Sequence, residues 1–146
     1  NVGLSGKTSN QIFENLKRLD LSKYTIAIIL AGTNDMLRNT STYIVNKLIS
    51  IHKYCLQQGI SHVYALSIPQ IHYDRPIRES KRLMVNTKLR SWCTSMKQVT
   101  YIPFGEMFTY QPGSNMWAHN GYHLSVRGYK RMGEFVSKKI IRNGNK

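Results

Sequence analysis

The sequence of 146 residues has few cysteines, and it lacks any long apolar run. Its two cysteines, Cys55 and Cys93, argue against a disulfide scaffold, and no Cys/His spacing typical of a zinc site is present. We expect both thiols to be buried and free, and the scarcity of cysteine favours an intracellular location. No apolar segment approaches the roughly 20 residues that a bilayer-spanning helix needs. We therefore expect no membrane span.

Acidic residues are scarce as well. The chain has 21 Lys and Arg against 7 Asp and Glu, which gives a formal net charge of +14. Such an imbalance favours an anionic partner, for example nucleic acid or an acidic membrane surface. The basic residues are scattered and form no compact run, so a basic protein without such a partner fits the composition equally well.

What the sequence does contain is a regular alternation of apolar patterns. Helical spacing predicts helices over about 9–19, 41–58, 78–96 and 126–141, and strand-like runs cover about 24–31, 62–68 and 99–103. Strands that alternate with helices pair in parallel through right-handed crossovers. We predict a single domain over residues 1–146, a three-layer α/β/α sandwich with a parallel sheet of the flavodoxin-like kind.

The segment Tyr24–Asp35 organises this prediction, because its apolar run Ile26–Ala31 ends abruptly in the turn Gly32-Thr33-Asn34-Asp35. A continuous apolar run is typical of a strand covered on both faces. The turn would then lie at the carboxyl edge of the sheet, where α/β proteins bind ligands. There, the amide of Asn34 could donate to a developing negative charge.

Only three strands are visible, which would leave this apolar strand near a sheet edge. The first residue is Asn1 and not Met. We therefore expect strands before Asn1 and interpret the chain as a fragment, a processed form or a trimmed form of a longer protein.

Three short motifs follow one another along the chain. They are Asn1-Val2-Gly3-Leu4-Ser5-Gly6-Lys7-Thr8-Ser9, Gly32-Thr33-Asn34-Asp35 and Asn120-Gly121-Tyr122-His123-Leu124-Ser125. Together they resemble the SGNH (GDSL-type) hydrolase superfamily of small α/β/α esterases, lipases and carbohydrate deacetylases. The resemblance covers nearly the whole chain, and the continuation to Gly128-Tyr129 is similar to the last block of the family.

The resemblance implies a role for each matching residue. Gly6 matches the glycine whose backbone N–H lines the oxyanion hole, Asn34 matches a second donor to it, and His123 matches the general base. The chemistry suits these residue types, since an oxyanion hole needs preorganised donors and a base near neutrality favours histidine. We expect the three to meet in one pocket at the tips of the strands. Simpler roles remain open, with Asn34 as a turn residue and Gly6 as a helix-entry glycine.

Two departures from the family pattern bear on activity. The family nucleophile is a serine in an amino-terminal Gly-Asp-Ser run, which this chain lacks, and the nearest substitutes, Ser5 and Ser67, are not in a nucleophile-like turn. Asn120 stands three residues before His123, where the family has Asp. The equivalent exchange costs a serine protease about 10⁴-fold. We therefore expect a weak enzyme even with a serine present, unless a main-chain carbonyl orients His123.

Two functions remain open at this point. The first is an ester hydrolase domain that acts by serine acyl transfer on a small acyl or acetyl ester, inactive or weak as it stands, with no metal or cofactor implied. The second is a non-catalytic module of the same fold that binds RNA or DNA through its basic surface. The resemblance allows the second, because some SGNH-like domains occur in retrotransposon proteins that handle RNA. Basic residues of the last predicted helix would serve it: Arg127, Lys130, Arg131, Lys138 and Lys139.

The loop over residues 70–76 is a candidate rim for a ligand. It contains Tyr73 and Arg75, and Arg78 follows it. These side chains suit an acidic or aromatic ligand, although a solvated loop is the simpler interpretation.

Overall fold

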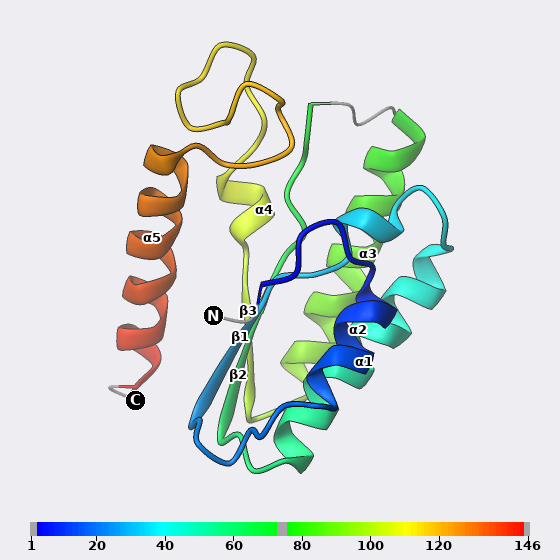
Figure 1. The fold of residues 1–146 in the computed structure, drawn as a ribbon, viewed down its shortest axis with the longest axis vertical. Helices are drawn as coiled ribbons and strands as arrows, with labels where there is room; N and C mark the ends of the chain where they lie inside the picture. The colour runs from blue at the N-terminus through cyan, green and yellow to red at the C-terminus, as the bar shows by residue number, and fades with distance from the viewer. Residues whose placement is uncertain (1–2, 73–75, 145–146) are drawn as a thin grey trace.

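The structure is a computed structural model that describes residues 3–72 and 76–144, with side chains up to residue 142 (Figure 1). Its centre is a parallel sheet of three strands in the order β1-β2-β3. The strands are β1 (Ile26–Ile29), β2 (His62–Leu66) and β3 (Val99–Ile102). Ile28 pairs with Tyr64, and Tyr64 pairs with Thr100. All three strands therefore end at the same edge of the sheet.

Helices lie on both sides of this sheet (Figure 1). One side carries α1 (Ser9–Leu16), α2 (Ser41–Gln57) and α3 (Pro76–Thr94), and the other carries α5 (Val126–Gly144). The predicted α/β/α fold with a parallel sheet is confirmed. Among the described residues, no helix is both long enough and apolar enough to cross a membrane.

Local sequence signals explain where the helices begin and end. Thr8 caps α1 by accepting a hydrogen bond from the Gln11 backbone N–H, while the Gln11 side chain accepts one from the Thr8 N–H. The Thr40 hydroxyl caps α2 by accepting a hydrogen bond from the Tyr43 backbone N–H. Gly59 follows α2 with a φ of 92°, a conformation that glycine adopts at little cost.

Two apolar clusters hold the layers together. The larger lies between the sheet and α1–α3 and includes Val63, Leu48 and Val85, together with both cysteines, which are buried and free as expected. The smaller joins Tyr64, Leu66 and Ile102 to Val136 of α5. Each cluster uses alternate residues of β2, as the period of two in a strand requires.

The prediction that β1 is covered on both faces is wrong. Ile26 and Ile28 are 42% and 49% exposed, whereas Ala27 and Ile29 are half-buried against the layer of α1 and α2. The cause is the position of β1 at the edge of the sheet, because the apolar face of α5 packs against residues of β2 and β3 instead. A continuous apolar run therefore did not distinguish a central strand from this edge strand.

Two short elements were not predicted. Thr33–Asp35 forms a single 3-10 turn, η1, and Phe104–Met107 forms the short helix α4 directly after β3. At Gly105 of α4, an added Cβ would lie 2.2 Å from the carbonyl oxygen of Ile68. Close contact between α4 and the segment after β2 thus requires glycine.

Candidate active site

A cleft of about 580 Å³ opens near the turn that follows β1. Its walls come from the loop before α1, from the turn after β1, from the start of α3 and from Tyr122. Figure 1 shows the dark-blue loop before α1 beside the cyan turn that follows β1. Gly6 and Asn34 both line this cleft, so the structure brings together two of the three residues expected to meet there.

One hydrogen bond ties the Gly6 loop to the Asn34 turn. The Asn34 Nδ2 donates to the carbonyl oxygen of Lys7 at 3.1 Å. An amide nitrogen carries two hydrogens, so the second can still donate into the cleft. Gly6 itself has a φ of 69°, a left-handed conformation that L-residues with a side chain adopt at a cost of about 1–2 kcal/mol. Glycine is therefore suited to this loop on conformational grounds.

Beneath the cleft, the Asp35 carboxylate joins the same two segments. It is fully buried and accepts hydrogen bonds from the Ser9 N–H at 2.7 Å, from the Ser9 hydroxyl at 2.9 Å and from the Asn39 side chain at 3.0 Å. Asp35 belongs to the Gly32-Thr33-Asn34-Asp35 motif, and no role was predicted for it. Its position directly after Asn34 was the available signal, and the structure shows that it anchors the turn to the start of α1.

The loop over residues 118–125 brings the histidine motif towards the cleft. The Ala118 N–H donates to the His123 carbonyl at 2.8 Å, and the His72 N–H donates to the Gly121 carbonyl at 3.0 Å. Tyr122 lines the cleft, whereas the exposed His123 is not among the lining residues. We expected Gly6, Asn34 and His123 to line one pocket. Gly6 and Asn34 share the cleft with Tyr122, the residue before His123, but the His123 side chain does not line it.

The orientation of the Asn120 amide determines which nitrogen of the neutral His123 ring carries the proton. The Asn120 Oδ1 accepts from the backbone N–H of Tyr122 at 2.9 Å and of His123 at 3.2 Å. Only an oxygen can accept both bonds, so the amide nitrogen must face the ring, where Nδ2 lies 3.1 Å from Nδ1 of His123. In the neutral ring, Nδ1 is then the acceptor and the proton is carried on Nε2.

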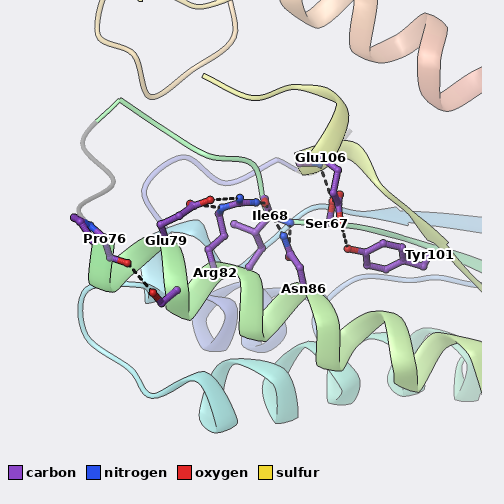
Figure 2. A network of polar contacts seen from close by, with 10 residues as sticks. Ser67, Ile68, Pro76, Glu79, Arg82, Asn86, Tyr101 and Glu106 are labelled. Carbon is purple, nitrogen blue, oxygen red and sulfur yellow. Dashed lines mark hydrogen bonds and ion pairs between the residues drawn. The ribbon is translucent and has the colours of Figure 1, made fainter. Parts of the chain in front are cut away.

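The segment after β2 is fixed by a buried polar network (Figure 2). Arg82 and Asn86 of α3 donate to the Ile68 carbonyl at 2.9 and 3.0 Å, and the Asn86 side chain accepts from the Ile68 N–H at 2.9 Å. Arg82 is also paired with Glu79. This network was not predicted, and it orients the chain that continues to Ile71 in the cleft wall and to His72.

Comparisons with known proteins identify the family and the fold of the chain. The model of the GDSL-like lipase/acylhydrolase family matches residues 1–131. The chain belongs to this family. A search of curated proteins finds no match.

Solved structures of GDSL-type hydrolases share the fold at low sequence identity. A protein from Streptococcus pneumonia, provisionally described as a platelet activating factor, has a TM-score of 0.80 at 21% identity, over 95% of this chain and 71% of its own. The psychrotrophic esterase EstA from Pseudoalteromonas has a TM-score of 0.78 at 17% identity, over 100% and 78%. The lipase/acylhydrolase from Enterococcus faecalis has 0.74 at 20% identity, over 92% and 71%.

The two serines considered as substitutes for the nucleophile of the GDSL family occupy different environments. Ser67 is fully buried; its hydroxyl accepts from the Gly105 N–H at 2.7 Å and donates to Glu106 (Figure 2). Tyr101 donates to the same carboxylate at 2.7 Å, and burial together with this contact raises the Tyr101 pKa. Ser67 therefore connects β2 to α4. Ser5 is exposed, and none of the described residues lining the cleft is a serine.

Of the candidate rim residues, Arg78 lines the cleft. Tyr73 and Arg75 lie outside the described residues. In the described part of the chain, no three His, Cys, Asp or Glu side chains gather as a metal-binding group.

Proposed function

We propose that this GDSL-family chain is an acyl-ester hydrolase domain that binds small acyl or acetyl esters and turns them over weakly as it stands. One observation carries the proposal: Gly6 and Asn34, from segments far apart in sequence, line one cleft and are tied by the bond from Asn34 to Lys7. If Asn34 were only a turn residue and Gly6 only a helix-entry glycine, the two would not need to line the same cleft.

The two donors suit an ester carbonyl that gains negative charge. In the described part of the chain, the Gly6 N–H has no hydrogen-bond partner, and the Asn34 amide uses one of its two hydrogens. Donors fixed before the reaction stabilise a developing oxyanion without reorganising, and loss of one such donor typically raises the barrier by about 3 kcal/mol.

The tautomer of the His123 ring limits the rate of ester hydrolysis. A general base needs an unprotonated Nε2 directed at the attacking group, and the Asn120 amide favours the proton on that nitrogen. A serine protease that receives Asn in place of its triad Asp loses about 10⁴-fold in turnover through the same change of tautomer. Serine acyl transfer further requires a nucleophile, and no serine is among the described residues of the cleft wall.

Hydrolysis of p-nitrophenyl acetate tests the proposal through Asn34→Ala. We expect the rate above buffer to fall by about tenfold or more, because an oxyanion donor is lost. Asn115→Ala, which removes an exposed amide outside the cleft wall, is the matched control and should keep the wild-type rate. If the wild-type rate is too low to measure, the same pair is compared in an Asn120→Asp background. Equal rates for Asn34→Ala and Asn115→Ala contradict the proposal.

A second function, binding of nucleic acid, is favoured by the composition of α5. Glu134 is the only acidic residue of this helix, and its carboxylate is paired with Arg131 at 3.3 Å. Five basic side chains of α5 are exposed, namely Arg127, Lys130, Arg131, Lys138 and Arg142, and Lys139 is half-buried. Such a face can neutralise phosphates along a nucleic acid strand.

Salt dependence of binding to single-stranded RNA tests this alternative. Phosphate contacts predict an affinity that falls steeply between low and moderate salt, with a smaller slope for Lys130→Gln/Lys138→Gln. The matched control is Lys53→Gln/Lys97→Gln, which removes the same charge from exposed positions away from α5. An identical slope for the two double variants would show that α5 is not the binding surface.

A further inference from the structure

We propose that the cleft selects esters that carry an anionic oxygen group, a carboxylate or a phosphate, at a distance from the scissile bond. This inference rests on the proposed hydrolase function for the ester itself. The selection for negative charge rests on the side chains of the cleft wall, and it can be tested by binding alone.

Three cationic side chains line the cleft, and they come from three separate parts of the fold. Lys7 belongs to the loop before α1, Arg38 follows the turn after β1, and Arg78 lies in the first turn of α3. No Asp or Glu is among the described lining residues. Like charges held around one small volume repel each other, and an anion between them relieves that repulsion.

The backbone beneath two of these cations is fixed. The Lys7 carbonyl accepts the hydrogen bond from Asn34 at 3.1 Å. The segment before Arg38 and the segment after it are held by Lys81 of α3, whose ammonium donates to the Met36 carbonyl at 2.8 Å and to the Asn39 carbonyl at 3.0 Å. The charges therefore stand on anchored segments, which lowers the ordering cost of binding an anion.

The two acidic groups that the structure describes next to the cleft wall already have partners. Asp35 is buried and bound to Ser9 and Asn39, and Glu79 forms an ion pair with Arg82. Neither carboxylate lines the cleft. Within the described residues, the charge presented to a ligand is thus positive. Because Gly6 and Asn34 share this cleft, an ester at their donors would bring its remote end within reach of the cations.

A titration followed by NMR compares two ligands that differ in one charge. Monoethyl glutarate carries a free carboxylate and one ester, and diethyl glutarate carries two esters and no charge. We expect the monoester to shift the backbone amide signals of Lys7, Asn34 and Arg38, with at least about fivefold tighter binding than the neutral diester. Glycerol 1-phosphate is the third ligand, and it distinguishes a site for carboxylates from one that also accepts phosphates.

Variants assign the selectivity to the cleft. Lys7→Gln and Arg38→Gln should each weaken monoester binding by about threefold and leave diester binding unchanged, an effect of the size seen for exposed charges. The matched controls are Lys97→Gln and Arg18→Gln, which remove one exposed cation of the same type outside the cleft wall. Arg78 is left intact because it has a further interaction within the chain.

Three results overturn the inference: equal affinity for the charged and the neutral ester, no binding of the monoester, or equal losses in the cleft and control variants. The proposed function fails separately. If p-nitrophenyl acetate hydrolysis is insensitive to Asn34→Ala while the charged ligand still binds through Lys7 and Arg38, the cleft is an anion site without ester turnover.

Discussion

The amide nitrogen of Asn120 lies 3.1 Å from Nδ1 of His123, so a hydrogen-bond donor faces the ring where a base needs an acceptor. The orientation is set by the two backbone N–H groups that bind the Asn120 oxygen. An aspartate here would accept a hydrogen bond from Nδ1–H and leave Nε2 unprotonated and free to act as a base. A single side chain therefore decides which nitrogen of His123 can take up a proton.

The first prediction is that Asn120→Asp exchanges the tautomer of neutral His123. In the wild type, Nε2 should carry the proton, because Nδ1 accepts from the amide. In the variant, one carboxylate oxygen can keep the backbone N–H bonds while the other accepts from Nδ1–H. Long-range ¹H–¹⁵N NMR of the imidazole nitrogens distinguishes the two states.

Asn115→Asp is the control for this experiment, since it adds the same charge to an exposed position of the neighbouring loop. It should leave the ring of His123 in the wild-type tautomer. A wild-type ring protonated at Nδ1 would refute the orientation assigned to Asn120.

The second prediction concerns the loop that carries His123. Gly121→Ala should destabilise the fold more than Gly113→Ala, because both glycines have positive φ, of 65° and 74°, but only Gly121 is crowded. A Cβ at Gly121 would lie 2.3 Å from Cβ of His72, and at Gly113 it meets no atom within 4 Å. We expect a loss of about 1 kcal/mol for Gly113→Ala and at least about 2 kcal/mol for Gly121→Ala in urea unfolding. Equal losses would mean that the contact with His72 is not rigid.

The third prediction concerns the carboxylate beneath the cleft. Asp35→Asn replaces one acceptor oxygen by a donor that must face Ser9 or Asn39, which are donors themselves. Leaving a buried donor without its charged partner should cost about 2–3 kcal/mol in the free energy of unfolding. Asp20→Asn, at an exposed carboxylate, should cost clearly less than Asp35→Asn. A small effect of Asp35→Asn would contradict its role as the anchor between α1 and the Asn34 turn.

The fourth prediction is a loss of stability at acidic pH through His52. Burial lowers its pKa from 6.5 to about 4, against the opposing effect of its bond to the Leu48 carbonyl. The unfolded chain therefore takes up this proton at a higher pH than the folded chain does. The stabilisation is fully present above about pH 6.5 and is lost as the pH falls to about 4, with a total of about 3 kcal/mol.

His52→Leu should remove this part of the pH dependence, as measured by urea unfolding at pH 7.5 and pH 4.5. His119→Gln, at an exposed histidine, should keep the wild-type difference. If His52→Leu shows the same difference as the wild type, another group causes the acid sensitivity.

The elements that the sequence predicted well are those set by local chemistry. The capping box of Thr8 and Gln11 and the stop at Gly59 depend on a few neighbouring residues. The helix α1 begins at the first signal, and α2 ends just before the second. The three visible strands predicted a position of β1 near a sheet edge, but its apolar run indicated two covered faces; which face is exposed depends on where α5 packs. The helix α4 depends on a contact between Gly105 and Ile68, which are distant in the sequence.

In the candidate site, too, some features followed from the sequence and others depend on tertiary contacts. The resemblance of the motifs to the GDSL family implied that Gly6 and Asn34 share a pocket, and both line the cleft. The anchors of the site, Asp35 and the pair Arg82 and Asn86, emerge only from tertiary contacts. The identity of Asn120 predicted the loss of a charge, whereas the direction of its amide required the backbone geometry of the loop.

The most direct test of the central claim, an ester-binding cleft with a neighbouring histidine held in the wrong tautomer, is the rate of p-nitrophenyl acetate hydrolysis by Asn120→Asp relative to the wild type. We predict a rise of at least about tenfold, because His123 becomes a general base, and its disappearance in Asn120→Asp/His123→Ala. An unchanged rate in Asn120→Asp, or a rise that persists without His123, would contradict the account.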